Sequence, residues 1–450
     1  MSCESIVLAA GLGTRMRSPL PKVLHTVAGR PMLKWVAETC REATGRPPTI
    51  VLGPGQEAIR PLVADATWVV QEERLGTGHA ALQAKEALGG HQGPVLIANG
   101  DMPLVTAGTM AALIDAQAAN PGPITLLTVK AGESRGFGRI LRESDARITG
   151  VIEEAHATPE QLAIHEFNAG VYCVRAEWLW EQLDNLPVSP KGEYYLTDLV
   201  SAAAEQEQQV AWVETRDPGE VIGINTQSHL AEAEAVAKQR IGNYWMEQGV
   251  TLQDPSSTYI ELGVSLSSGA TILANTHLQG ETRIGAGSVI GPNTVIKDSR
   301  VGENCVVLAS HLEGATLGDR VQIGPFGHLR TGAELADEVH LGNFGEVKNS
   351  RLGQGVKMGH FSYIGDATIG AETNIGAGTI TCNFDGAKKN ETHIGREAFI
   401  GSDTMLVAPL RIGDGARTGA GSVVTKDVDD HSLAVGMPAR VIRRLEEDHE

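Results

Sequence analysis

The stretch that decides the fold is residues 282–296, which reads TRIGAGSVIGPNTVI. Isoleucine returns at every sixth position, as Ile284, Ile290 and Ile296, and Gly follows the first two. The same spacing of Ile or Leu extends over residues 272–296 and recurs over residues 317–341 and 394–412. A period of six, held over many steps, indicates an internal repeat.

A triangular coil accounts for this period, because three short faces of six residues each need one inward aliphatic per face. Gly and small polar residues tolerate the tight corners between faces. Such coils bury a core only by stacking on one another, so many consecutive steps are required. The pattern resembles the left-handed parallel β-helix of the hexapeptide acyltransferases. Chance spacing in a Gly-rich sandwich would not hold register for so long.

Composition sets the outer limits of the interpretation. A chain of 450 residues exceeds one ordinary core, so two domains are expected. The formal charge of −18 argues against a nucleic-acid partner. Five scattered cysteines without zinc spacing are typical of reduced thiols in a cytoplasmic protein. We expect no signal peptide and no membrane contact, since no segment approaches the ~20 apolar residues of a spanning helix.

The first half of the chain has the pattern of an α/β domain, here a Rossmann-like layer. Apolar runs at 5–10, 49–52, 94–98, 124–129 and 169–174 predict strands, and helical patterns at 31–43 and 79–88 lie between some of them. Alternating strands and helices indicate a mostly parallel sheet. Ligands of such sheets bind beyond the carboxyl ends of the strands.

The loop after the first predicted strand is the first candidate site. Gly11 and Gly13 leave room for backbone N–H groups to face phosphate, and Arg15 and Lys22 can offset its charge. Gly-x-Gly alone is also found in ordinary tight turns. Met16 stands where a dinucleotide fingerprint requires Gly, which disfavours a nicotinamide site.

The second candidate loop is Asn99-Gly100-Asp101, at the end of a buried strand. A carboxylate there can hold Mg²⁺ against a triphosphate, although a lone Asp at a strand end is commonly a turn or cap residue. Together with this loop, the joined pattern LAAGLGTRM (8–16) and LPKVL (20–24) resembles the sugar-1-phosphate nucleotidylyltransferases.

That resemblance assigns roles in the first domain. It implies that Arg15 and Lys22 are catalytic, that Asp101 and Asn225 bind Mg²⁺, and that Gln71 and residues 75–79 contact a uracil base. The residues matched to nucleotide and sugar contacts are Leu8, Ala9, Ala10, Gly11, Lys22, Gln71, Gly76, Thr77, Asn99, Gly100, Asp101, Gly138, Glu153, Asn168 and Asn225.

Apolar residues at helical spacing between 230 and 245, with Gly249 as a stop, predict one linking helix. We therefore expect a nucleotidylyltransferase domain at 1–225, a linker helix at 226–249 and a β-helix domain at 250–450.

The β-helix has its own candidate site, where residues 383–390 interrupt the ladder. Insertions in solenoids become loops, often at the binding face. A lone His is usually structural, but His360 lies within one or two coils of Arg330, Lys348 and Tyr363. The two cationic side chains can bind a sugar phosphate, and the histidine can remove a proton from its amine.

With NIGAGTITCNFDG (374–386) and FIGSDTMLVAP (399–409), the resemblance covers nearly the whole chain. It is to the bacterial family of bifunctional N-acetylglucosamine-1-phosphate uridylyltransferase / glucosamine-1-phosphate N-acetyltransferases. The resemblance makes His360 the proton acceptor. Phe384 and Met437 stand where many members carry Tyr and Arg. It also implies sugar-phosphate contacts at Arg330, Lys348, Tyr363 and Asn374, and acetyl-CoA contacts at Ala377, Asn383, Phe384, Ser402 and Ala420.

The implied enzyme acetylates glucosamine 1-phosphate with acetyl-CoA. It then transfers UMP from UTP to N-acetylglucosamine 1-phosphate and releases pyrophosphate, supplying peptidoglycan and lipopolysaccharide precursors. The family also implies a homotrimer. Two alternatives stay open: a nucleotidylyltransferase with a purely structural β-helix, and a non-catalytic scaffold. Arg330, Lys348 and His360 argue against the first alternative, and Arg15 and Asp101 against the second.

Overall fold

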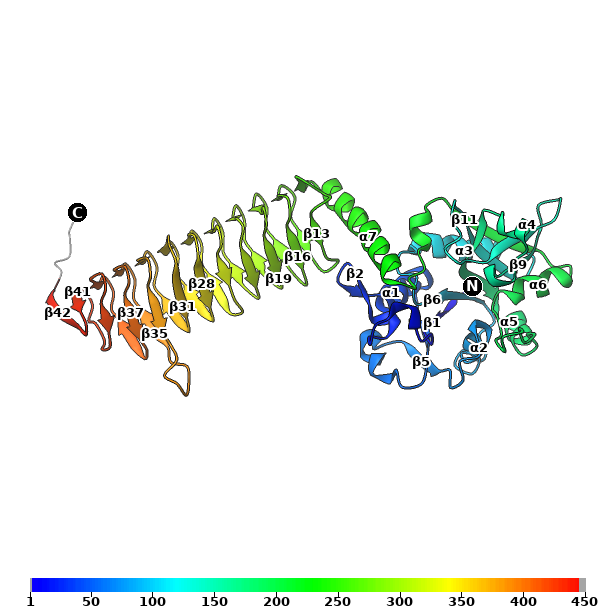
Figure 1. Ribbon diagram of the computed structural model, residues 1–450, viewed down its shortest axis with the longest axis horizontal. Coiled ribbons are helices and arrows are strands. Elements are labelled where there is room, and N and C mark those ends of the chain that lie inside the picture. Colours follow the sequence, from blue (N-terminus) through cyan, green and yellow to red (C-terminus); the bar gives the residue numbers. More distant parts are fainter. Residues whose placement is uncertain (1, 445–450) are drawn as a thin grey trace. The chain divides into compact units, whose positions relative to one another are not determined.

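The structure is a computed structural model and describes residues 2–444 (Figure 1). The chain divides into two compact units, Met1–Ala237 and Lys238–Glu450. The division falls inside helix α7 (Gln227–Glu247), which is the helix expected at 226–249. The functional boundaries at 225 and 250 stay a prediction. No helix within the described residues is long and apolar enough to cross a bilayer.

A twisted sheet of order β11-β7-β10-β6-β1-β4-β5 forms the centre of the first unit. Strand β10 runs antiparallel to both of its neighbours, and the other adjacent pairs are parallel, so the predicted mostly parallel sheet is confirmed. A hairpin of β8 and β9 extends from β10. The strands are β1 (Glu4–Leu8), β4 (Thr49–Leu52), β5 (Thr67–Val70), β6 (Pro94–Asn99), β7 (Ile124–Lys130), β8 (Arg139–Arg142), β9 (Ile148–Ile152), β10 (Glu166–Arg175) and β11 (Val210–Thr215), with a separate pair β2 (Thr26–Val27) and β3 (Arg30–Pro31).

Helices cover both faces of this sheet. Neighbouring residues of β1 point to opposite sides, and both sides of the strand are buried. Ile6 packs in the core layer that contains residues of α2, α5 and α6, whereas Val7 packs in the layer that contains residues of α1 and α3. Both side chains are fully buried. The helices are α1 (Met32–Thr44), α2 (Thr77–Leu82), α3 (Ala107–Ala119), α4 (Pro159–Leu162), α5 (Ala176–Leu183) and α6 (Asp198–Glu205).

The helix predicted at 79–88 is wrong in its extent, because α2 ends at Leu82. The side chain of Gln83 donates from Nε2 to the carbonyl of His79 at 3.1 Å. That carbonyl would otherwise accept the helical bond from the Gln83 N–H, which instead reaches the Ala80 carbonyl at 3.2 Å. Side-chain competition for a backbone carbonyl therefore ends the helix, and turns follow it.

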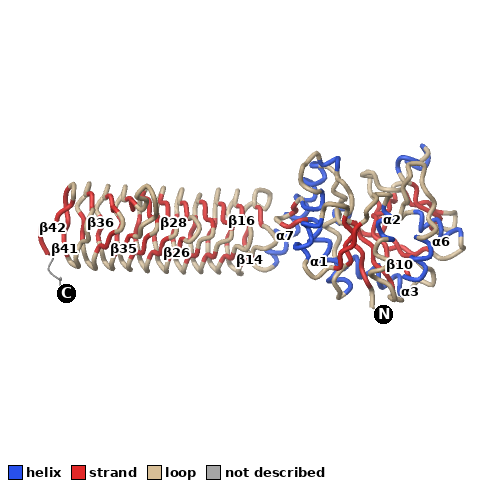
Figure 2. The backbone as a smooth tube through the Cα atoms, turned by 90° about the horizontal axis from the view of Figure 1, so that it is seen from below, coloured by secondary structure: helices blue, strands red, loops and turns tan. Residues whose placement is uncertain are grey.

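The second unit is a triangular prism of parallel strands, whose successive coils are visible in Figures 1 and 2. The first face contains β12 (Thr251–Leu252), β15 (Thr271–Ile272), β18 (Val289–Ile290), β21 (Val306–Val307), β24 (Gln322–Ile323), β27 (His340–Leu341), β30 (Lys357–Met358), β33 (Asn374–Ile375), β36 (Phe399–Ile400), β39 (Arg417–Thr418), β41 (Ser432–Gly436) and β42 (Ala439–Arg444). The second face contains β13 (Tyr259–Ile260), β16 (His277–Gln279), β19 (Val295–Lys297), β22 (His311–Glu313), β25 (His328–Leu329), β28 (Gly345–Lys348), β31 (Ser362–Gly365), β34 (Ile380–Cys382), β37 (Met405–Val407) and β40 (Val423–Val424). The third face contains β14 (Ser265–Leu266), β17 (Arg283–Ile284), β20 (Arg300–Val301), β23 (Thr316–Leu317), β26 (Ala333–Leu335), β29 (Ser350–Leu352), β32 (Ala367–Ile369), β35 (Thr392–Ile394) and β38 (Leu410–Ile412).

The six-residue ladder fills the interior of the prism, as predicted. Ile290 and Ile296 are completely buried, and Ile290 pairs in register with Ile272 one coil before it. Ile296 pairs with Leu312, only 16 positions further along. The first and second runs of the ladder therefore fall out of step between 296 and 317, because the coils shorten there and not because the prism ends.

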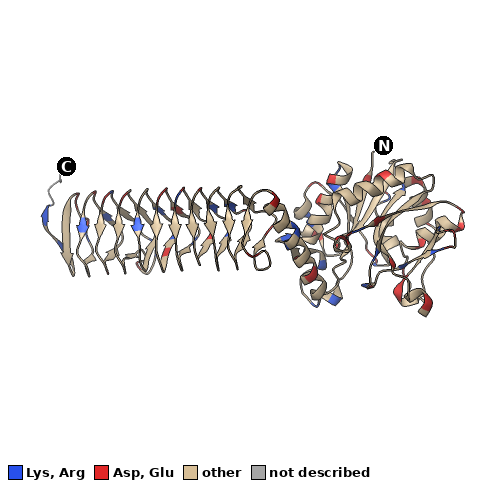
Figure 3. Ribbon diagram, turned by 90° about the horizontal axis from the view of Figure 1, so that it is seen from above, with Lys and Arg blue, Asp and Glu red and all other residues tan. Residues whose placement is uncertain are grey.

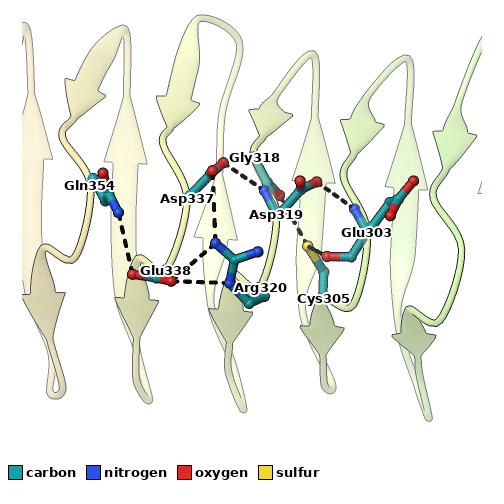
Figure 4. A network of polar contacts seen from close by, with 8 residues as sticks. All are labelled: Glu303, Cys305, Gly318, Asp319, Arg320, Asp337, Glu338 and Gln354. Carbon is teal, nitrogen blue, oxygen red and sulfur yellow. Dashed lines mark hydrogen bonds and ion pairs between the residues drawn. The ribbon is translucent and has the colours of Figure 1, made fainter.

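Polar corners connect one coil to the next (Figure 4). The N–H of Glu303 donates to Asp319 Oδ1 at 2.8 Å, and the N–H of Asp319 donates to Asp337 Oδ1 at 2.9 Å. Corner carboxylates thus satisfy N–H groups that the strands leave unpaired. The last strand, β42, folds back antiparallel onto β41 and carries three arginines in its sequence ARVIRR (Figure 3).

Two candidate active sites

A cavity of about 520 Å³ opens where β1 and β6 end, at the edge of the sheet predicted to bind ligands. Eleven of the predicted residues, catalytic or nucleotide-binding, lie along it. Its lining is Leu8, Ala9, Ala10, Gly11, Leu12, Arg15, Lys22, Val23, Gln71, Arg74, Gly76, Thr77, Ala80, Asn99, Asp101, Glu193 and Tyr195.

The two halves of the signature LAAGLGTRM…LPKVL are packed directly on each other. Gly13 has φ 66°, in the left-handed region, and a Cβ atom there would lie 2.5 Å from Cβ of Lys22. Only glycine fits such a position without displacing Lys22. The loop therefore fixes where the lysine side chain enters the cavity.

Four polar side chains meet beside this loop. The ammonium group of Lys22 contacts the carboxylate of Asp101 and lies 2.7 Å from Asn225 Oδ1. Arg15 Nη2 lies 2.8 Å from the same Asn225 oxygen. The predicted cationic and metal-binding residues are thus brought together from four separate segments.

The oxygen atoms of Asp101 and Asn225 converge on a single cationic group, so this pair fits a bound cation. Within the described residues, no cluster of three or more His, Cys, Asp or Glu side chains could hold a metal ion. Two protein oxygens are the usual complement for Mg²⁺, which takes most of its other ligands from water and substrate phosphates.

The predicted base-binding residues line the cavity on the side of α2. Gln71 is almost fully buried, and its Nε2 donates to the Gly76 carbonyl at 3.0 Å. Thr77 Oγ1 accepts from the N–H of Leu196 at 3.0 Å. Gly76 has φ 99°, and a Cβ there would lie 2.5 Å from the Tyr194 carbonyl oxygen. The segment is therefore held tightly against residues 194–196.

The predicted sugar-pocket residues form a neighbouring group outside the lining of the cavity. The N–H of Asn168 donates to the Gly138 carbonyl at 2.8 Å, and its Nδ2 lies 2.6 Å from the hydroxyl of Tyr172. Glu153 Oε1 accepts from Thr197 Oγ1 at 3.2 Å. Burial raises the pKa of Glu153 above its ordinary value.

Sequence reasoning missed several cavity residues. Arg74 Nε donates to the Ala10 carbonyl at 2.8 Å and so braces the loop that follows β1. Arg74 directly precedes residues 75–79, which were predicted to contact the base, and this position could have indicated it. Glu193 and Tyr195 belong to a loop without a recognisable motif, so only the fold reveals that they line the cavity.

In the second unit, three of the four predicted phosphate and sugar residues gather on the second face, and they are Arg330, Lys348 and Tyr363. Strand pairing aligns Glu346 with Tyr363 and Lys348 with Gly365. Arg330, just after β25, extends Nη1 to within 3.1 Å of Glu346 Oε1. His360 is exposed at the corner that leads into β31. Glu346 was not predicted, since its place beside Arg330 depends on strand register.

The remaining predicted acetyltransferase residues do not join this group within one chain. Asn374 lies in β33, on the first face. The corner between the first and second faces carries Ala377 and Ser402. There the N–H of Asp403 donates to the Ala377 carbonyl, and the N–H of Gly421 donates to the Ser402 carbonyl. The predicted acetyl-CoA residues are thus divided between that corner, with Ala377, Ser402 and Ala420, and the corner between the second and third faces, with Asn383 and Phe384.

The loop 383–390 projects from the prism next to β35 (Figure 1). The Asn390 N–H donates to the Asn383 carbonyl at 2.7 Å and closes its neck. Asp385 accepts from the N–H groups of Ala387 and Lys388, and these bonds help to lower its pKa to about 2. The loop therefore has a defined internal structure.

Comparison with known proteins gives the class of both units. Residues 5–188 match the MobA-like NTP transferase domain, and residues 391–426 match the hexapeptide repeat of succinyl-transferase. The fold and these matches together define a transferase that joins an α/β nucleotidyltransferase unit to a left-handed parallel β-helix.

Relatives match the chain over nearly its full length. It is 44% identical to the bifunctional protein GlmU of Heliobacterium modesticaldum, covering 96% of this chain and 94% of the relative. It is 46% identical to the bifunctional protein GlmU of Stutzerimonas stutzeri, covering 97% and 96%. The chain belongs to the family of bifunctional GlmU proteins.

The enzyme is accordingly bifunctional, with N-acetylglucosamine-1-phosphate uridylyltransferase and glucosamine-1-phosphate N-acetyltransferase activities in UDP-N-acetylglucosamine synthesis for the cell wall. UTP and acetyl-CoA are its co-substrates. A purely structural β-helix, the first alternative, is not favoured, because the match to bifunctional relatives includes it.

Proposed function

We propose that uridylyl transfer takes place in the cavity at the ends of β1 and β6, and acetyl transfer on the second face around His360. The convergence of Lys22, Asp101 and Asn225 is the observation that carries the first assignment. The placement of Lys348 and Tyr363 on the adjacent strands β28 and β31, two register positions apart, supports the second.

In uridylyl transfer, a phosphate oxygen of N-acetylglucosamine 1-phosphate attacks the α-phosphorus of UTP, and pyrophosphate leaves. Arg15 and Lys22 bind the phosphates and offset the charge on the transferred group. Asp101 and Asn225 hold Mg²⁺, which supplies further charge neutralisation. Gln71 and Thr77 orient the base, and Gly138, Glu153 and Asn168 contact the sugar.

In acetyl transfer, the amine nitrogen of glucosamine 1-phosphate attacks the thioester carbon, and the coenzyme A thiolate leaves. Arg330 and Lys348 bind the sugar phosphate, which places the amine near His360. His360 accepts the proton that the amine must lose, because only the neutral amine is nucleophilic. Tyr363 and Asn374 contact the sugar.

The active form is a homotrimer in this proposal. One chain divides its acetyl-CoA residues between two corners, so a compact site needs a neighbouring copy. Phe326 and Phe344 stack with their ring centres 5.0 Å apart on a corner of the prism, yet they are 56% and 59% exposed. An exposed aromatic column suits contact with a second copy of the chain, and a closed threefold ring buries it on every copy.

We place the enzyme in the cytoplasm, where UTP and acetyl-CoA are made. All five cysteines are free, and four of them are buried. Free thiols suit a reducing compartment.

The assignment of both activities is tested by incubating the purified protein with glucosamine 1-phosphate, acetyl-CoA, UTP and Mg²⁺. We expect UDP-N-acetylglucosamine, and we expect omission of acetyl-CoA to prevent its formation. Formation of UDP-glucosamine in the full mixture, or no nucleotide sugar at all, would overturn the proposal.

A further inference from the structure

Asp366 lies at the corner between the second and third faces, between β31 and β32. Its backbone is left-handed, with φ 50°, and its half-buried carboxylate uses both oxygens. Oδ1 accepts from Asn349 Nδ2 at 2.7 Å, and Oδ2 accepts from Asn383 Nδ2 at 2.6 Å. A carboxylate only accepts hydrogen bonds, so both amides are fixed with their NH₂ groups toward Asp366.

The main chain of Asp366 adds two further attachments. Its N–H donates to the Lys348 carbonyl at 3.2 Å, and its carbonyl accepts from the Thr392 N–H at 3.1 Å. Asn383 begins the loop 383–390, and Thr392 begins β35 just after that loop. Both ends of the loop are therefore tied to one residue, through its side chain at one end and its backbone at the other.

These attachments lead directly to the residues proposed for acetyl transfer. Asn383 Nδ2 also lies 3.4 Å from the hydroxyl of Tyr363, and Asn349 directly follows Lys348 in the chain. A displacement of the Asp366 carboxylate would shift the loop relative to both Tyr363 and Lys348.

We propose that Asp366 is a positioning residue for acetyl transfer, which holds the loop 383–390 in the orientation that receives the coenzyme beside the sugar phosphate. It acts through Asn383 and need not touch either substrate. This inference rests on the proposed placement of the acetyltransferase site.

Asp298 provides a matched control. It occupies the same corner of an earlier coil, with φ 48°, and its N–H likewise donates to the preceding coil, at Gln279. Its carboxylate, however, accepts from a backbone donor, the Glu281 N–H at 3.0 Å, and the coil carries no insertion. If every corner aspartate had the same structural role, Asp298→Asn and Asp366→Asn would have equal effects on the enzyme.

The test measures KM for acetyl-CoA, KM for glucosamine 1-phosphate, kcat and hydrogen exchange of the loop in both variants. Asn at 366 has one acceptor oxygen for two amide donors, so one donor loses its partner. We expect Asp366→Asn to raise KM for acetyl-CoA roughly 10-fold, the change expected for loss of a hydrogen bond to a charged group. The amides of Asn390 and Thr392 should exchange faster, and uridylyl transfer should be unchanged.

The double variant Asp366→Asn with Asn383→Asp reverses the donor and acceptor and should restore loop protection. It keeps the test valid if the single variant folds poorly. Unchanged KM and loop exchange in Asp366→Asn, equal effects in Asp298→Asn, or no restored protection in the double variant would each overturn the inference. Failure of the wild type to acetylate would instead overturn the proposed function.

Discussion

The Nζ atom of Lys22 lies 2.7 Å from Oδ1 of Asn225, although 203 positions separate the two residues. The same ammonium group contacts Asp101, whose side chain is only 21% exposed. One loop, one strand end and the segment before α7 thus direct a cation and two oxygen ligands to a common point.

Replacement of Asp101 tests the metal site. Asp101→Ala removes the only charged ligand of the proposed Mg²⁺, so we expect uridylyl transfer to be lost and acetyl transfer to continue at the wild-type rate. Pyrophosphate release and coenzyme A release measure the two activities separately. Asp115→Ala, an exposed residue of α3, is the control and should change neither. Equal loss of both activities in folded Asp101→Ala would refute the assignment.

Replacement of His360 tests the base. We expect His360→Ala to lower acetyl transfer on the order of 10²–10⁴-fold, the usual share of general base catalysis. Uridylyl transfer from ready-made N-acetylglucosamine 1-phosphate should continue. His311→Ala, an exposed residue of the same face in an earlier coil, should retain both activities. Full acetylation by His360→Ala at neutral pH would place the base elsewhere.

Lys348 should act differently from His360, because it binds the phosphate and takes no proton. We expect Lys348→Ala to raise KM for glucosamine 1-phosphate at least 10-fold, since it removes a hydrogen bond to a charged group, with a smaller change in kcat. Steady-state kinetics with the sugar phosphate varied provides the measurement. A fall in kcat without a rise in KM would contradict a binding role.

The aromatic column predicts the response of the trimer to Phe344→Ser. Loss of one ring from the stacked pair should weaken subunit contacts, so sedimentation velocity should show smaller species and acetyl transfer should fall with them. Leu162→Ser, at a 44% exposed position of the first unit, should sediment as the wild type does. An active wild-type monomer would refute the trimer itself.

Glu153 predicts a pH-dependent stability. Its folded-state pKa is raised by burial, so the folded unit holds the proton more tightly than the unfolded chain, whose Glu titrates near ~4.3. The stabilising contribution of the proton is present below that value and is lost as pH rises through the folded pKa. Glu153→Gln should therefore raise the urea midpoint at pH 8 and leave it nearly unchanged at pH 4. An equal shift at both pH values would contradict the burial argument.

Asp198, whose pKa is raised by burial and by Glu153, should titrate closer to its ordinary value in the variant.

The sequence was sufficient for the ladder, the parallel sheet and the cavity loops, because periodicity and glycine positions report directly on backbone geometry. It was insufficient for Glu346 and Asp366, which resemble many other acidic residues near corners. Their neighbours lie one coil away, and coil length varies: Ile296 pairs 16 positions ahead, whereas Ile272 pairs 18 ahead. The end of α2 was missed because one side chain, Gln83, competes for a backbone carbonyl.

We expect two independent sites on one chain to complete the synthesis in sequence. The decisive experiment mixes Asp101→Ala with His360→Ala and supplies glucosamine 1-phosphate, acetyl-CoA, UTP and Mg²⁺. We predict that neither variant alone forms appreciable UDP-N-acetylglucosamine and that the mixture does, because one releases the acetylated sugar phosphate that the other consumes. A mixture that stays inactive, or either variant forming the product alone at the wild-type rate, would contradict the account.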